Sequence, residues 1–173
     1  MILKNKYLFI SFLSVVLLLT ACTGNNPLSK VNVDKPRISY GGVSFNFPEQ
    51  WKLETENIDN GDISYIDIAD DEDLYMKIWI MNFVDIPEKK LENYLLDWGP
   101  EYKVESEAVA SARFGEYDAK MRKYSVSLND LAVYGNAYSF CYGGKTFLIT
   151  KHSESRVKLQ HSFSLIESTF HIE

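Results

Sequence analysis

The chain has 173 residues, of which 46% are hydrophobic, 14% aromatic and 24% charged, and its formal net charge is −6. The first 21 residues carry Lys4 and Lys6 and no acid; without them, 16 basic residues stand against 24 acidic ones, a net charge of −8. Phosphate binding needs a basic patch, so this balance argues against nucleic acid as a partner. It argues equally against adsorption of the protein body on anionic lipid.

The N-terminus has the pattern of an export signal. Lys4 and Lys6 precede the apolar run Tyr7–Leu19, which only Ser11 and Ser14 interrupt. A helix needs roughly 20 residues to cross a ~30 Å hydrocarbon core, and this run is shorter. Its length suits the apolar region of a secretory signal peptide. An uncleaved anchor helix is the alternative.

The apolar run ends in Leu19-Thr20-Ala21-Cys22. This segment resembles the lipobox of bacterial lipoproteins, in which a branched apolar residue and two small residues precede a cysteine. The resemblance implies a signal peptide over residues 1–21 and fatty acyl chains, palmitate among them, on Cys22. Two or three such chains, at about 0.8 kcal/mol per buried CH2, hold a protein stably on a membrane.

The predicted location is therefore extracytoplasmic. In lipoproteins of the enteric type, an aspartate after the cysteine favours retention in the inner membrane, so Thr23 favours the outer membrane, with the domain in the periplasm. Residues 22–36 are rich in polar turn formers, which predicts a flexible tether before a globular domain over residues 37–173. Acylated Cys22 leaves Cys141 without a disulfide partner, so the core must stabilise the domain.

Alternation of apolar and polar residues predicts mostly strands joined by tight turns. The expected strands are Arg37–Tyr40, Val43–Phe47, Trp51–Thr55, Ile63–Ile68, Leu74–Phe83, Lys103–Phe114, Tyr117–Leu128, Leu131–Tyr142 and Lys145–Thr150. Gly41-Gly42 is typical of a two-residue hairpin turn. Leu74–Phe83 is apolar on both faces, which predicts a central strand covered on both sides.

Two segments have helical periodicity. Pro87–Trp98 carries an apolar stripe, with Pro87 in the first turn and Asp85 as the expected cap. The last segment has Ser153 as the expected cap and repeats apolar residues at helical spacing. The two stripes are Leu91, Tyr94, Leu95 and Trp98, and Leu159, Phe163, Ile166 and Phe170. Each stripe must be buried against the sheet, which predicts an α+β fold: a three-layer α/β/α sandwich around an antiparallel sheet.

The segment Val43–Trp51 resembles the opening F-x-F-P-x-x-W strand and turn of PsbP-like proteins. Phe114–Ala119 resembles their strand and turn after the middle helix, and Gly143–Thr150 with Ile166–Phe170 resembles their closing hairpin and helix. The resemblance covers most of Gly41–Phe170 and implies the same α/β/α sandwich. Members of that family include an extrinsic photosystem II subunit, a relative that binds a small nuclear GTPase, and bacterial lipoproteins. Most are accessory or binding modules, and the resemblance transfers no functional residue.

The acidic run contains the weak metal-ligand candidates Asp70, Asp71 and Asp73, with Asp67 nearby. Several carboxylates suit Ca2+, but the run lacks the glycine and the spaced acids of an EF-hand loop. A solvated hairpin tip that blocks edge-to-edge aggregation is the favoured reading. We therefore expect no metal and no cofactor.

The histidines and the free thiol also favour structural roles. His152, His161 and His171 are too widely spaced for the usual zinc motifs and are expected at the surface. Cys141 lies between Phe140 and Tyr142, which supply no base, and is expected to be a buried packing residue.

Six tyrosines suggest an aromatic docking surface, with a helix-covered sheet face as the favoured alternative. They are Tyr102, Tyr117, Tyr124, Tyr134, Tyr138 and Tyr142. The sequence has no nucleophile elbow, Walker loop or dinucleotide fingerprint, so no catalytic residue is predicted.

The leading hypothesis is a membrane-tethered, non-enzymatic binding or assembly module of the cell envelope, with the membrane and an envelope protein as its partners. The alternatives are an envelope hydrolase whose site assembles only in three dimensions, and a carrier of a small ligand or cation.

Overall fold

The computed structural model describes residues 35–129 and 131–173. The predicted signal peptide, Cys22 and nearly all of the predicted tether lie outside the described residues.

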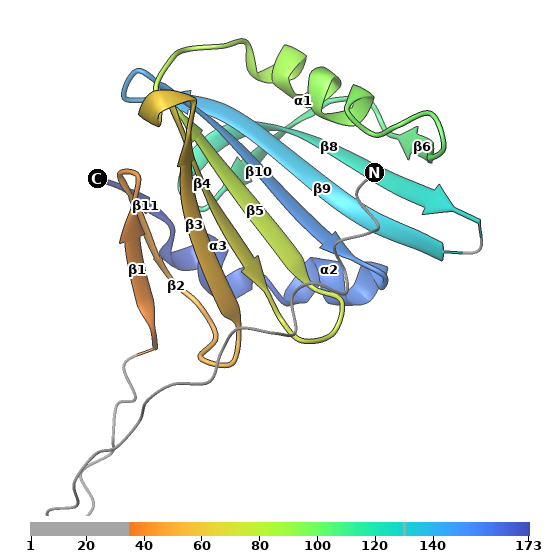
Figure 1. The fold of residues 1–173 in the computed structure, drawn as a ribbon, viewed down its shortest axis with the longest axis horizontal. Helices are drawn as coiled ribbons and strands as arrows, with labels where there is room; N and C mark the ends of the chain where they lie inside the picture. The colour runs from red at the N-terminus through yellow and green to blue at the C-terminus, as the bar shows by residue number, and fades with distance from the viewer. Residues whose placement is uncertain (1–34, 130) are drawn as a thin grey trace, which may run out of the picture. The chain divides into compact units, whose positions relative to one another are not determined.

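Eight strands form an antiparallel sheet in the order β3-β4-β5-β10-β9-β8-β6, and β7 also pairs with β8 (Figure 1). Their bounds are β3 Lys52–Ile58, β4 Ile63–Ala69, β5 Tyr75–Met81, β6 Lys103–Ser106, β7 Ala110–Phe114, β8 Tyr117–Leu128, β9 Leu131–Tyr142 and β10 Lys145–Ser153. A short 3-10 helix, η2 (Asp59–Gly61), joins β3 to β4. The bounds of β8 and β9 agree with the sequence pattern. β5 lies inside the sheet, as its two apolar faces indicate, and Met76 and Ile78 are fully buried.

A second, three-stranded sheet has the order β1-β2-β11. β1 (Arg37–Tyr40) and β2 (Val43–Asn46) form the expected hairpin at Gly41-Gly42. Both glycines have positive φ, +64° and +87°, a conformation that suits residues without a Cβ. β11 (His171–Ile172) pairs with β2. The sequence predicts one sheet only, because a two-residue strand is too short to show an alternating pattern.

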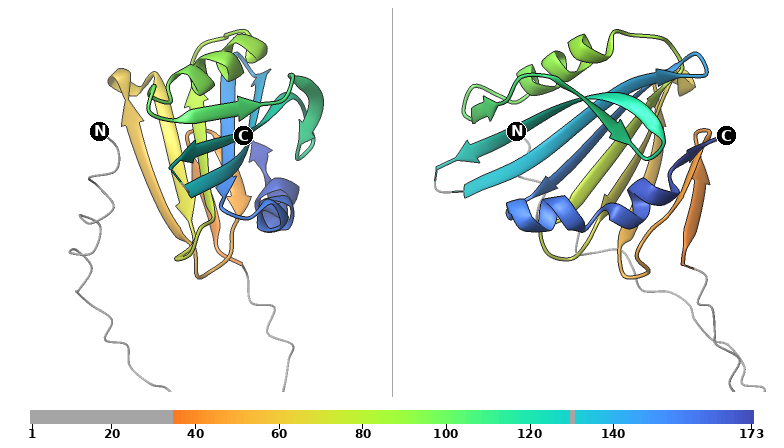
Figure 2. Two further views of the ribbon diagram at one scale, coloured as in Figure 1. Left: turned by 90° about the vertical axis from the view of Figure 1, so that its right-hand side faces the viewer. Right: turned by 180° about the vertical axis from the view of Figure 1, so that it is seen from behind.

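The helices pack on the two faces of the large sheet. α1 (Pro87–Leu96) contacts β8, β9 and β10, whereas α2 (Arg156–His161) contacts β9 and β10 from the opposite side, and α3 (Ser164–Thr169) contacts β2. Figures 1 and 2 show the sheet between α1 and the α2–α3 pair. Two separate apolar clusters fill these contacts. Phe147 and Ile149 of β10 belong to the α2–α3 cluster, whereas Leu148, between them, belongs to the α1 cluster.

Both expected helix caps are wrong. The residue that precedes α1 is Ile86, and the carboxylate of Asp85 accepts a hydrogen bond from its N–H at 2.8 Å. Ser155 caps α2 by accepting from the N–H of Lys158 at 3.4 Å. Ser153 is instead buried at the end of β10, where its hydroxyl donates a hydrogen bond to the carboxylate of Asp73 in the acidic loop.

Two predicted elements are divided. The expected strand Lys103–Phe114 becomes β6 and β7. Ser106 is opposite Tyr124 and Ala110 is opposite Met121. The edge segment therefore advances four residues while β8 advances three. The extra residue is a β-bulge. The expected C-terminal helix is interrupted near Phe163, which stays buried between α2 and α3.

Candidate binding pocket between the sheet and helix α2

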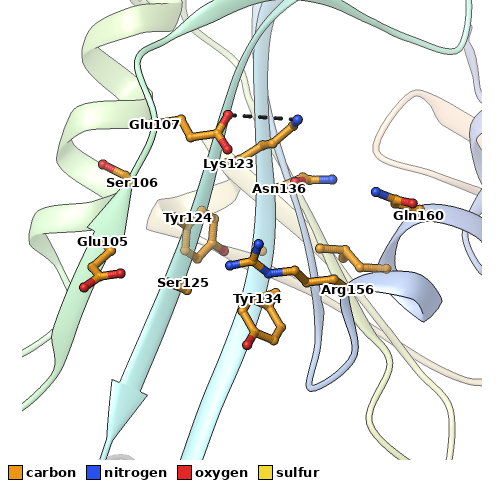
Figure 3. A pocket seen from close by; sticks show the side chains of 12 residues that line it. Glu105, Ser106, Glu107, Lys123, Tyr124, Ser125, Tyr134, Asn136, Arg156 and Gln160 are labelled. Carbon is orange, nitrogen blue, oxygen red and sulfur yellow. Dashed lines mark ion pairs between the residues drawn. The ribbon is translucent and has the colours of Figure 1, made fainter.

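A pocket of about 410 Å³ lies where β6, β8 and β9 approach α2 (Figure 3). One wall comes from β6 and the bulge that follows it, with Glu105, Ser106 and Glu107. The floor comes from β8 and β9, and the other wall from α2. Regular elements therefore hold most of the lining in place.

Strand pairing aligns the side chains of the floor. Lys123 is opposite Asn136, and Ser125 is opposite Tyr134. Residues that are two apart along a strand point to the same face, so all four side chains lie on the α2 side of the sheet. The intervening residue of β9, Gly135, contributes to the pocket lining through its backbone.

Helical periodicity builds the opposite wall. Arg156, Leu159 and Gln160 line the pocket and are spaced i, i+3 and i+4, which places them on one face of α2. Leu159 is buried and secures the helix to the sheet. The guanidinium of Arg156 lies over the ring of Tyr134, with 4.5 Å from Cζ to the ring centroid, a cation–π contact.

Charges of both signs line the pocket. Lys123 Nζ is 3.9 Å from a carboxylate oxygen of Glu107, and Lys103 Nζ is 2.6 Å from Glu105. The hydrogen bond and charge of Lys103 lower the pKa of Glu105. Arg156 has no acidic partner among the residues that the structure describes, so it is the unneutralised charge of the pocket.

A cluster of aromatic side chains and one histidine lies on the other face of the sheet, beneath α1. Tyr124, Gly135, His152 and Tyr75 follow one another across β8, β9, β10 and β5 in register. The hydroxyl of Tyr94, from α1, is 3.0 Å from His152 Nε2 and 3.0 Å from the hydroxyl of Tyr124.

Aromatic side chains cover most of the imidazole of His152, which stays partly accessible to solvent. Tyr124 also hydrogen bonds to its Nε2, the ring of Tyr75 stacks on it at 5.7 Å, and Trp98 meets it edge-on at 6.3 Å. Burial lowers the pKa of His152 to about 4 and raises the pKa of Tyr124. The expectation of a surface position is therefore wrong for His152. The expectation holds for His161 and His171, which are exposed.

Gly135 connects the two faces. A Cβ at this position would lie less than 3.0 Å from the ring of Tyr124, closer than real Cβ atoms approach other groups. The absence of a side chain lets the Tyr124 ring cover β9 and reach His152, while the backbone of Gly135 lines the pocket behind it.

The acidic loop between β4 and β5 is tied to α2. Asp73 accepts hydrogen bonds from Ser153 Oγ at 2.8 Å, the Glu154 N–H at 3.0 Å and Lys158 Nζ at 2.9 Å. Lys158 also contacts Glu72 at 2.6 Å. The bond from Lys158 contributes most to the lowered pKa of the Asp73 carboxyl.

The structure brings two of the three weak metal candidates together. Asp70, Glu72 and Asp73 each offer an oxygen, and these atoms lie within 4.8 Å of one another, whereas Asp71 pairs with Lys52. Asp70 accepts from the backbone N–H groups of its own loop. The Lys158 ammonium group already pairs with Glu72 and Asp73. The carboxylates of the loop therefore serve to attach the loop to α2.

Cys141 departs from expectation, whereas five of the six tyrosines lie in apolar clusters packed under the helices, in line with the favoured reading of their role. Cys141 is exposed at the end of β9, where its Sγ donates to the backbone oxygen of Asp85 at 3.1 Å. The six tyrosines do not share a face. Tyr117, Tyr134 and Tyr138 belong to the α2–α3 cluster, whereas Tyr102 and Tyr124 belong to the α1 cluster. A single docking surface made of all six is therefore wrong.

The chemistry of the pocket depends on residues that the sequence pattern did not single out. No local pattern marks Arg156, Asn136 or Gln160 as functional, although the spacing of Arg156, Leu159 and Gln160 is visible in the sequence. In the part of the chain that the structure describes, no helix combines the length and the apolar character needed to cross a membrane.

The fold is similar to known structures at low sequence identity. The solution structure of cyanobacterial PsbP (CyanoP) from Synechocystis sp. PCC 6803 is 13% identical, with 86% of this chain and 98% of that chain covered and a TM-score of 0.59. A Bacteroides thetaiotaomicron VPI-5482 protein is 11% identical over 76% of this chain and 45% of its own, with a TM-score of 0.51.

LpqN, involved in cell envelope biogenesis of Mycobacterium tuberculosis, is 14% identical over 79% of this chain and 89% of its own, with a TM-score of 0.41. No protein-family model and no curated protein matches the sequence. The likeness to CyanoP confirms an α+β fold of the PsbP type with a large antiparallel sheet.

Proposed function

We propose that this chain is a membrane-tethered lipoprotein of the bacterial cell envelope, and that its domain is a non-enzymatic binding module. The observation that carries the binding role is the pocket, which joins an open volume of about 410 Å³ to an arginine without an acidic partner among the described residues. The three-layer α/β/α arrangement belongs to the same proposal, and the apolar clusters on the two faces of the sheet support it.

The polar groups of the pocket favour binding over catalysis. Both of its carboxylates, Glu105 and Glu107, have a lysine partner. A nucleophilic serine needs an adjacent base. Within the described pocket lining, neither Ser106 nor Ser125 hydrogen bonds to a histidine or a carboxylate. Such a lining suits recognition of a ligand more than attack on it.

The membrane address rests on the lipobox-like segment at Cys22. A Cys22→Ser variant tests it by cell fractionation and intact mass. The proposal expects the parent protein in the membrane fraction with residues 1–21 removed and acyl mass added. It expects the variant to retain residues 1–21 and to carry no acyl mass. If the variant enters the membrane fraction and is cleaved in the same way as the parent, membrane attachment through Cys22 is wrong.

The binding role is tested by a photo-crosslinking amino acid placed at Gln160 in intact cells. His161 is the matched control, because it is exposed on the same helix but is not a lining residue. The proposal expects an adduct at position 160, resolved by mass spectrometry, that does not form at position 161. Equal adducts at both positions, or none at position 160, would refute the pocket as the binding site.

A further inference from the structure

The charges of the pocket leave one positive group available. Glu107 is matched by Lys123, and Glu105 by Lys103 outside the lining. Arg156 pairs with neither glutamate and lies over the ring of Tyr134. Because a cation–π contact uses the face of the guanidinium, its N–H donors remain able to bind an anion. The available charge is positive although the whole chain has a formal net charge of −6.

The surroundings of Arg156 suit a carboxylate attached to an apolar or planar body. A guanidinium presents parallel N–H groups that bind both oxygens of a carboxylate. Asn136 on the floor and Gln160 on the α2 wall both line the pocket (Figure 3), and their amides can donate further hydrogen bonds. Tyr134 and Leu159 add apolar surface.

The opposite wall sets a limit on the charge of the ligand. Glu105 and Glu107 line the wall formed by β6, and although each pairs with a lysine, their carboxylates disfavour a ligand with a second negative charge. A singly charged carboxylate therefore fits better than a doubly charged phosphate. The volume of about 410 Å³ is in the range of small-molecule sites, and it would also accommodate the last residues of a peptide.

We infer that the pocket binds the carboxylate of a small organic acid or of a peptide C-terminus, with Arg156 as the residue that recognises it. This inference rests on the proposed binding function and names its ligand class. Both sources present the same group to Arg156, so the experiment compares them directly.

The test uses the full lipidated chain purified in detergent micelles. The probes are benzoate against benzamide, and N-acetyl-Ala-Ala-Phe as the free acid against its C-terminal amide. The readout is the 15N NMR signal of the Arg156 side-chain Nε–H, assigned with Arg156→Lys. We expect saturable shifts with the acids and weaker ones with the amides. The acid that binds more tightly identifies the source.

Substitutions separate recognition from folding. Arg156 is exposed, so Arg156→Gln should leave the fold intact and weaken binding of the better acid about tenfold or more. Affinity for this variant is followed through the backbone amides of α2. Arg113→Gln, which alters an exposed arginine outside the pocket, should leave the affinity unchanged.

Three results would overturn the inference: equal affinity for acid and amide, an unchanged affinity in Arg156→Gln, or no shift with either acid at high millimolar concentration. If the crosslink at Gln160 still forms in cells, only the ligand class is wrong. If that crosslink is absent, the binding function itself fails.

Discussion

His152 gives the domain a pH dependence of stability that can be isolated by mutation. Its ring is enclosed by Tyr75, Tyr94, Tyr124 and Trp98, and burial lowers its pKa to about 4. An unfolded histidine titrates near ~6.5. Between these two values the unfolded chain binds a proton that the folded protein does not, so stability falls as the pH falls through this window. Above it, His152 contributes no pH dependence.

The expected magnitude follows from the two pKa values. A shift of one unit corresponds to about 1.4 kcal/mol, so acidification from pH 7 to pH 4 lowers the free energy of unfolding by about 3 kcal/mol at most. Part of His152 remains accessible to solvent, which reduces the loss to about 2 kcal/mol. Nearby charges do not reverse the sign, because Asp67 is paired with Lys77 at 3.1 Å and bound by Tyr75.

Urea unfolding at pH 7 and pH 4 measures this loss. His152→Gln can still hydrogen bond to tyrosine hydroxyls but does not titrate, so its loss on acidification should be about 2 kcal/mol smaller than that of the parent. His161→Gln, which changes an exposed histidine, should behave as the parent does. Carboxylates titrate in all three proteins and cancel in the comparison. Equal losses in the parent and in His152→Gln would refute burial of a neutral imidazole.

Three further predictions concern the packing and the acidic loop. Gly135→Ala should destabilise the domain by about 1–3 kcal/mol, because the new Cβ overlaps the Tyr124 ring. In thermal unfolding, the added substitution Tyr124→Leu should restore part of the lost stability. An unchanged melting temperature in Gly135→Ala would contradict the close packing of Tyr124 on Gly135. Asp73→Asn should cost about 1–3 kcal/mol in urea unfolding, because it weakens three hydrogen bonds at a mostly buried carboxylate. Asp71→Asn, in an exposed pair with Lys52, should have little effect. Equal losses of stability in the two variants would show that the hydrogen bonds of Asp73 do not stabilise the domain. Calorimetric titration with Ca2+ should give no binding heat, because Ca2+ would have to displace Lys158, which already pairs with the carboxylates of Glu72 and Asp73; a saturable signal would restore the cation-carrier alternative.

Local patterns predicted most elements of the large sheet, because alternation reports directly on which side of a strand is buried. β8 and β9 are long enough for this signal to define their ends. The sequence does not indicate the bulge after Ser106, since neither glycine nor proline marks it. Only the pairing of β6 and β7 with β8 reveals the extra residue. The pairing of β11 with β2 joins residues at opposite ends of the domain, which no local pattern encodes.

The candidate site was less predictable than the fold. The burial of His152 follows from alignment across four strands and from a tyrosine supplied by α1, so it depends on register and not on local spacing. The role of Arg156 likewise depends on residues far from it in the sequence, because Lys103 and Lys123 pair with the two glutamates that line the pocket. The exposure of Cys141 arises because β9 ends beside a loop instead of beneath a helix.

The most direct test of the central claim is the yield of the crosslink at Gln160 in intact cells that carry Arg156→Gln, relative to the parent arginine. A tethered module that recognises its ligand through Arg156 predicts that the substitution removes most of the adduct while the amount of protein in the membrane fraction stays the same. An undiminished adduct at the same protein level would show that the pocket does not bind its ligand through this residue.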